Sequence, residues 1–184
     1  MGRIITILGP HGVGKTTLQK YIRSNNLGLV YEGFTLEVDG LNLKDVDDYI
    51  KYEKKYLNII NEQNLEIKNS HMDGYTVRSI DEVEYYLTKH NPKIPSNLIS
   101  ELLDKELNIF SDYLIYLDAS QSTLKGRIAG DFIRDQEETE TWYNDEYLDY
   151  EYFWKNKNNL IVIDTNNKST KEIFNDILLA LKGE

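Results

Sequence analysis

A glycine-rich loop near the amino terminus is the feature that most constrains the fold. Residues 8–18 read LGPHGVGKTTL and contain the pattern G-x-x-x-x-G-K-[ST] from Gly9 to Thr16. Such a loop turns backbone N–H groups toward the phosphates of a nucleoside triphosphate, and it works between a strand and a helix. The flanks agree, because RIITIL (3–8) predicts a buried strand and TTLQKYIRS (16–24) predicts a helix. The sequence therefore predicts nucleotide binding.

Each residue of the loop has an expected part in binding. Lys15 would place its charge on the β- and γ-phosphates, and the Thr16 hydroxyl would bind Mg²⁺. ATP and Mg²⁺ are therefore the expected cofactors, and Lys15 is an expected catalytic residue. His11 occupies a free position of the pattern, where simple exposure is the preferred interpretation. The predicted nucleotide-binding residues are Gly9, Pro10, His11, Gly12, Val13, Gly14, Lys15, Thr16 and Thr17.

Beyond the loop, predicted strands and helices alternate. Apolar runs bounded by polar residues predict further strands at 27–34, 65–73, 112–120 and 159–165. Helical spacing of apolar residues predicts helices at 44–63, 79–90, 96–110, 142–156 and 169–182. This alternation predicts an α/β protein of the three-layer P-loop NTPase type, with a central parallel five-stranded sheet and helices on both faces. A length of 184 residues fits a single domain, 1–184.

Composition excludes several classes of function. The net charge of −10 repels a nucleic-acid backbone, so nucleic acid is not an expected partner. The chain has no cysteine and 3 histidines, which excludes disulfides and thiolate chemistry and disfavours a zinc site. No apolar run reaches the length that spans a membrane. We therefore expect a cytoplasmic protein without a membrane partner.

Two carboxylates stand where predicted strands end. Ligands of a parallel α/β sheet lie at the carboxyl ends of its strands. Asp73 closes the predicted strand 65–73 and would lie near Thr16 as a second magnesium ligand; the alternative is that it only begins a turn with Gly74. Glu32 closes strand 27–34 and would accept a proton from a hydroxyl acceptor; the alternative is a solvated charge.

A polar segment at about 129–141 is the predicted lid. Arg127 and Arg134 bracket its start and would stabilise the transferring phosphoryl group when the lid closes. An exposed, charged helix end is the alternative interpretation of both arginines. Among the many aromatic residues, three stand where an acceptor could lie, namely Tyr31, Phe34 and Tyr75.

The order of these parts resembles the nucleotide and nucleoside kinases among P-loop proteins, particularly the thymidylate kinase and deoxynucleoside kinase branch. GPHGVGKTTL is similar to the family's phosphate loop, and Glu32-Gly33 resembles its strand-end Glu-Pro, whose glutamate acts as a base in deoxynucleoside kinases. YLIYLDASQSTLKGRI (113–128) resembles the fourth strand and the helix that leads to the lid, and LIVIDTNNKSTKEIFNDIL resembles the closing strand and helix. The family's Asp-Arg or Glu-Arg at the third strand is replaced by Asp73-Gly74, with Arg78 about one helical turn later.

The leading hypothesis is an ATP-dependent kinase that transfers the γ-phosphate to a nucleoside, a nucleoside monophosphate or a similar metabolite. One alternative is a P-loop ATPase or nucleotide switch that acts on a protein partner. Another is a degenerate homologue that binds nucleotide without catalysis. The resemblance also makes a homodimer an option, because members of the family are often dimers.

Overall fold

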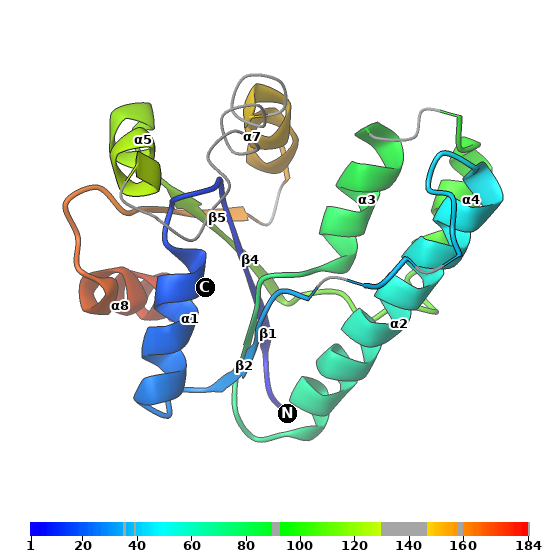
Figure 1. Cartoon of the computed structure of the whole chain (residues 1–184). Coiled ribbons are helices and arrows are strands. Elements are labelled where there is room, and N and C mark those ends of the chain that lie inside the picture. The colour runs from blue at the N-terminus through cyan, green and yellow to red at the C-terminus, as the bar shows by residue number, and fades with distance from the viewer. Residues whose placement is uncertain (35, 39, 90–92, 130–146, 158–159, 184) are drawn as a thin grey trace. The chain divides into compact units, whose positions relative to one another are not determined.

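The computed structural model describes residues 1–34, 36–38, 40–89, 93–129, 147–157 and 160–183. Its sheet contains five strands in the order β2-β3-β1-β4-β5 (Figure 1). These strands are β1 (Ile4–Leu8), β2 (Leu29–Tyr31), β3 (Gly74–Thr76), β4 (Tyr113–Asp118) and β5 (Leu160–Asp164). β1 pairs in parallel with β3, with Ile4 beside Gly74, and β4 pairs in parallel with β5, with Leu114 beside Leu160. The predicted α/β fold with a five-stranded parallel sheet is confirmed.

Helices connect the strands, as the alternation predicted. The described helices are α1 (Lys15–Ser24), α2 (Val46–Asn69), α3 (Ile80–Lys89), α4 (Ser96–Leu102), α5 (Gln121–Ala129), α7 (Tyr147–Lys155) and α8 (Thr170–Ala180). Within this described part of the chain, no helix combines the length and the apolar character needed to cross a bilayer.

The chain divides into two compact units. The first comprises residues 1–6 and 31–112, and the second comprises 7–30 and 113–184. In the first unit α2 packs on α3 (Figure 1), and their apolar faces form a core that includes Ile60, Val83 and Leu87. In the second unit α1 packs on α8, and α8 on β5. The single domain 1–184 stays a prediction.

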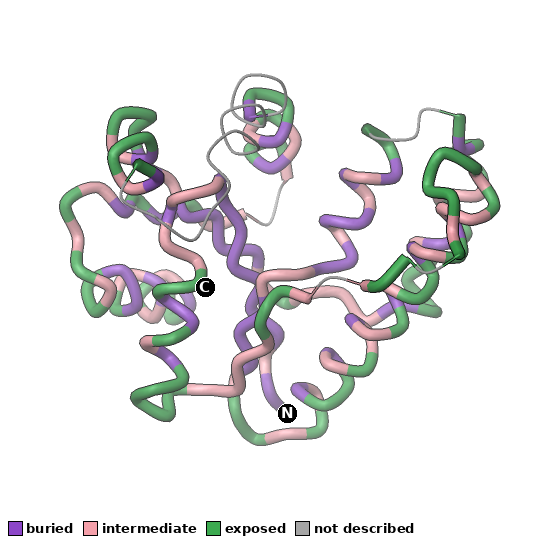
Figure 2. Tube along the Cα trace, viewed as in Figure 1, coloured by how far each residue is buried: buried purple, intermediate pink, exposed green. Residues whose placement is uncertain are grey.

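Burial follows the strand pattern that the sequence predicted. β1 is buried along its whole length and β4 along its middle, as Figure 2 shows for the strands at the centre of the sheet. Continuous apolar runs such as IITIL suit strands that have neighbours on both sides and helices packed against them. A capping box begins α8: Ser169 Oγ accepts from the Glu172 N–H, and the Glu172 carboxylate accepts from the Ser169 N–H.

The predicted strand 65–73 is wrong. Residues up to Asn69 continue α2, and the strand that pairs with β1 is only Gly74–Thr76. The buried positions Leu57, Ile60, Asn64 and Ile67 keep the helical spacing to the end of α2. Because that spacing does not change before Ser70, the segment packs as a helix, although its residue types also suit a strand. Predicted strand 27–34 and helix 96–110 are likewise shorter in the structure, as β2 and α4.

Candidate active site

The glycine-rich loop has the geometry of a phosphate-binding loop. It leaves β1 at Leu8 and enters α1 at Lys15, so the helix amino terminus follows directly. Gly14 caps that helix with φ at 107°, a left-handed conformation that side chains other than glycine rarely adopt. Helix amino termini carry partial positive charge and N–H groups without helical partners. The loop is therefore shaped for an anion.

The Lys15 ammonium lies back against this loop. It donates hydrogen bonds to the carbonyl oxygens of Gly9 and Pro10, the latter at 3.0 Å. Thr16 stands exposed at the start of α1, where its hydroxyl can reach a metal bound to phosphate oxygens. His11 is half-buried within the loop rather than exposed.

A pocket of about 710 Å³ surrounds the loop. This volume lies within the range of about 300–1,000 Å³ that is usual for ligand sites. Most of the predicted nucleotide-binding residues line it, together with basic and polar side chains from α5 and from the start of α8. Its lining residues are Pro10, Gly12, Val13, Gly14, Lys15, Thr16, Thr17, Leu18, Lys20, Arg127, Lys168, Thr170 and Ile173. The volume, the glycine loop and the cations of its wall fit a nucleoside triphosphate.

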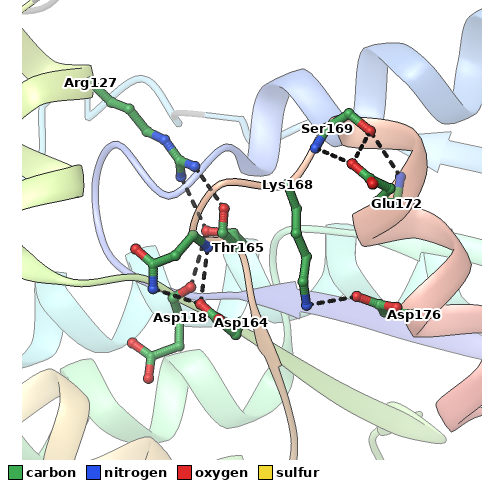
Figure 3. A network of polar contacts seen from close by, with 9 residues as sticks. Asp118, Arg127, Asp164, Thr165, Lys168, Ser169, Glu172 and Asp176 are labelled. Carbon is green, nitrogen blue, oxygen red and sulfur yellow. Dashed lines mark hydrogen bonds and ion pairs between the residues drawn. The ribbon is translucent and has the colours of Figure 1, made fainter.

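Arg127 joins this pocket to the segment after β5. Its guanidinium donates to the Val13 carbonyl at 3.1 Å. It also donates to Thr165 Oγ1 at 3.1 Å and to the Thr165 carbonyl at 2.9 Å (Figure 3). Thr165 Oγ1 in turn donates to the Asp118 carbonyl at the end of β4. Arg127 thus holds the phosphate loop against two strand ends, which positions the loop. Its predicted action on a transferring phosphoryl group stays a prediction.

The same network extends to the start of α8. Lys168 forms an ion pair with Asp176 at 2.8 Å, and Ser169 caps the helix with Glu172 (Figure 3). Asp164 accepts hydrogen bonds from the backbone N–H and the side-chain amide of Asn166, which lowers the pKa of Asp164. These contacts fix the backbone of residues 164–170 beside the phosphate pocket.

The first unit contains a separate aromatic pocket. Its volume is about 260 Å³, just below the usual range for ligand sites. We call it the aromatic pocket; α2 supplies half of its wall. It is lined by Phe34, Tyr49, Tyr52, Glu53, Tyr56, Arg78, Val83 and Tyr86. The Phe34 and Tyr56 rings pack against each other, with centroids 4.6 Å apart and planes inclined by 35°.

Two carboxylates and one guanidinium belong to this pocket or lie beside it. The Glu82 carboxylate accepts two hydrogen bonds from Arg78 Nη1, at 3.1 and 3.2 Å. Glu53 is only 5% exposed, and burial raises the pKa of its carboxyl to about 7. The nearby Glu82 also raises that pKa, whereas a hydrogen bond from Tyr49 opposes the rise. Around neutral pH, Glu53 is therefore divided between its acid and its carboxylate forms.

The structure does not bring Asp73 to the phosphate loop. Asp73 precedes β3, and the pairing of Gly74 with Ile4 places it at the start of β1, whereas the loop follows the end of β1. Its carboxylate binds the Arg3 guanidinium at 2.6 and 3.0 Å, and this hydrogen bonding lowers the pKa of Asp73. Asp73 as a magnesium ligand is therefore corrected to an ion-paired residue at the opposite end of the strands. The wrong prediction for Asp73 follows from the wrong prediction of a strand at 65–73.

β3 ends at Thr76, and Val77 and Arg78 follow it. Glu32 follows β2 directly and is exposed, and its role as a base stays a prediction. Gly33 lies near Arg78, because a Cβ at Gly33 would be 3.7 Å from Arg78 Nε. Arg134 and most of the predicted lid, residues 130–141, lie outside the described residues.

Sequence reasoning missed most of the aromatic pocket. Of the three aromatic residues singled out, Phe34 lines it, whereas Tyr75 is buried in β3 and Tyr31 is half-buried with a hydrogen bond to Glu66. The missed signal is the spacing of Tyr49, Tyr52 and Tyr56 on α2, which puts three rings along one stripe of the helix. The second missed signal is Glu53, a glutamate within that stripe.

A phosphate loop between β1 and α1, in a parallel five-stranded sheet, defines a P-loop α/β protein. The model of the AAA domain family matches residues 5–151, and the chain belongs to that family. No curated protein sequence matches the chain significantly.

Solved structures of kinases share this fold. Deoxyadenosine kinase from M. mycoides, solved with dCMP and dCDP, is similar with a TM-score of 0.59 and 24% identity over 98% of this chain and 100% of that chain. Thymidylate kinase from Candida albicans gives a TM-score of 0.64 and 14% identity over 99% and 92% of the two chains. The enzyme from Ehrlichia chaffeensis gives 0.54 and 18%, over 98% of each. The fold is that of the P-loop nucleoside and nucleotide kinases, as the resemblance predicted.

Proposed function

We propose that the protein is a nucleoside kinase, which transfers the γ-phosphate of ATP to a hydroxyl group of a nucleoside. The observation that carries the proposal is the pair of pockets, one built on a phosphate loop and one lined by aromatic rings with little positive charge. The similar deoxyadenosine and thymidylate kinases support the reaction class.

The residues of the phosphate pocket account for the donor side. Lys15 would leave the loop carbonyls and bind the β- and γ-phosphates, which neutralises charge as the phosphoryl group departs. Arg127 would keep the loop in position through Val13. Mg²⁺, when bound, would supply further neutralisation of the phosphate charge. In the described part of the chain no cluster of three or more acidic or histidine side chains could hold a metal, so Thr16 and the phosphate oxygens are its expected ligands.

The charge of the aromatic pocket favours an uncharged acceptor. Among its described lining residues the only cation is Arg78, and that guanidinium already binds the buried Glu82 carboxylate. A nucleoside monophosphate would bring about two negative charges toward Glu53 and Glu82, with repulsion that a half-buried site screens poorly. A nucleoside brings none, and its flat base suits a pocket walled by four tyrosines and a phenylalanine.

A hydroxyl acceptor also gives Glu32 a part in the reaction. The hydroxyl must lose its proton as it attacks the phosphorus, and a carboxylate within hydrogen-bond reach can take that proton. A phosphate acceptor is already ionised and needs no such base. Substitution of Glu32 should therefore slow the reaction if the acceptor is a hydroxyl group and have little effect if it is a phosphate.

The test is ATP-dependent phosphorylation of a panel of nucleosides and their monophosphates. We expect product from at least one nucleoside, a loss of kcat of about 100-fold or more in Glu32→Gln, and no detectable turnover in Lys15→Ala. Glu37→Gln, which changes an exposed carboxylate of the same segment, is the matched control. Transfer to monophosphates alone would contradict the proposal, and so would ATP hydrolysis with no acceptor product.

A further inference from the structure

Among the described residues that line the aromatic pocket, Glu53 carries the one carboxyl group. It lies on α2 between the ring-bearing turns of Tyr49 and Tyr56, and it is buried, whereas the other acidic residues of the same helix are exposed or half-buried. A buried carboxyl costs free energy unless it is hydrogen-bonded or neutral, so its presence in a ligand pocket needs a reason. The Tyr49 hydroxyl satisfies one of its oxygens.

We propose that Glu53 reads the base of the acceptor nucleoside, and that its neutral acid form binds a ring edge carrying one hydrogen-bond donor beside one acceptor. This inference rests on the proposed function, because it takes the aromatic pocket as the acceptor site. Adenine, cytosine and thymine each carry such an edge. The acid O–H donates to the ring's acceptor while the acid C=O accepts from the ring's donor.

The carboxylate form of Glu53 has a different pattern. It has two acceptors and no donor, so it repels the ring nitrogen of adenine or cytosine and the carbonyl oxygen of thymine. Guanine carries such a mixed edge as well, at its O6 and ring N–H, but its ring N–H and its amino group also present two donors side by side. A carboxylate accepts from both. The protonation state of Glu53 therefore decides which bases the pocket can bind.

Titration of Glu53 falls in a range where this difference can be measured. Burial raises the pKa of Glu53 to about 7, against the opposing effect of Tyr49. The raised pKa values of Tyr49, Tyr52, Tyr56 and Arg78 keep each of these neighbours in a single protonation state around neutral pH. The remaining groups that face Glu53 are Glu82, held in its ion pair with Arg78, and the Tyr86 phenol.

Equilibrium binding of deoxyadenosine and deoxyguanosine tests the proposal. For the wild-type protein we expect the Kd of deoxyadenosine to rise about tenfold from about pH 6 to about pH 8, because only the acid form binds it. The Kd of deoxyguanosine should not rise over the same range. Glu53→Gln keeps one donor and one acceptor, so its Kd for deoxyadenosine should stay constant within about twofold. Glu62→Gln, an exposed site on the same helix, should behave as the wild type.

Phosphoryl transfer is measured in parallel, so that the two proposals can fail separately. If the two nucleosides show the expected difference in pH dependence but no phosphorylated product forms, base recognition by Glu53 is supported and the kinase proposal is contradicted. If product forms but the Kd of deoxyadenosine is the same at both pH values, the kinase proposal is supported and base recognition by Glu53 is contradicted. The inference would also be overturned if circular dichroism shows that Glu53→Gln is folded and its Kd for deoxyadenosine still changes tenfold with pH. Failure of both nucleosides to bind would overturn it as well. The comparison of deoxyadenosine with deoxyguanosine on the wild-type protein does not depend on the folding of any variant.

Discussion

At the scale of single residues, a partner defines the role of a carboxylate more than its place in the sequence does. Glu53, Asp73 and Glu82 are all acidic residues of the first unit, and each has a different environment. Glu53 is buried beside a tyrosine, Asp73 binds Arg3, and Glu82 binds Arg78. Burial favours the neutral form of the first, whereas hydrogen bonds from Arg3 favour the charged form of the second. Of Glu53 and Asp73, only Glu53 is therefore suited to bind as an acid around neutral pH.

Because Asp73 forms an ion pair with Arg3, we expect its substitution to lower the stability of the protein and to leave its requirement for Mg²⁺ unchanged. Asp73→Asn removes the bidentate contact with Arg3, and we expect the free energy of unfolding to fall by about 1 kcal/mol at neutral pH, since solvent screens this half-exposed pair. The pKa of Asp73 is lowered in the folded state, so its contribution is present above the usual carboxyl pKa and is lost as the pH falls through the lowered value. Urea unfolding of both proteins at neutral and acid pH measures this difference.

Turnover of Asp73→Asn at limiting Mg²⁺ is the accompanying control. If Asp73 has no part in the metal site, the Mg²⁺ concentration that gives half-maximal activity will equal that of the wild type. A clearly higher requirement in the variant would restore the metal role that the structure removes.

At the scale of elements, the junction between α2 and β3 determines where the third strand begins. Gly74 is buried there, and a Cβ on it would lie 2.2 Å from Cγ1 of Ile67 on α2. The glycine therefore allows the end of the helix to approach the strand closely. Ser70 ends the helix, with its N–H bonded to the carbonyls of Glu66 and Ile67.

Gly74→Ala should therefore destabilise the protein by about 1–3 kcal/mol through overpacking. Ile67→Ala removes the atoms that an added methyl would meet, although it leaves a cavity of its own. We expect the double variant to lose less stability than the sum of the two single variants, with a coupling of about 1 kcal/mol or more. Chemical unfolding of the four proteins gives the coupling. Additive losses would show that the two residues do not compete for the same space.

The same junction shows what the sequence could predict and what it could not. The phosphate loop, β1, α1, β4 and α8 were predictable, because local patterns such as a glycine motif, an apolar run or a capping box determine them. The end of α2 was not, because residues 65–69 suit either a helix or a strand and only packing against β3 decides between them. Asp73 was misassigned for that reason. Glu53 was missed because the pocket around it also uses Val83 and Tyr86 of α3, which is distant in the sequence.

At the scale of the whole molecule, each compact unit carries a pocket of its own. The phosphate pocket is lined by residues of the second unit, and the aromatic pocket by residues of the first. The proposed function thus assigns donor and acceptor recognition to separate parts of the chain. Changes in one pocket should alter binding of one substrate while leaving the other pocket intact.

Hydrogen exchange of backbone amides tests this separation directly. A ligand that binds the folded state slows the local opening of the elements it contacts. A non-hydrolysable ATP analogue with Mg²⁺ should therefore protect the phosphate loop, α1 and the start of α8, whereas a bound nucleoside should protect α2 around Glu53 and the segment from Arg78 to Tyr86.

Lys15→Ala supplies the matched control for this experiment. It removes a phosphate ligand without touching the aromatic pocket, so protection by the ATP analogue should fall sharply while protection by the nucleoside persists. Nucleoside protection confined to the phosphate loop and α8 would contradict the division, because it would mean that the aromatic rings of α2 do not hold the acceptor. Protection of both regions by the analogue alone would contradict it too, since a single ligand would then stabilise both pockets together.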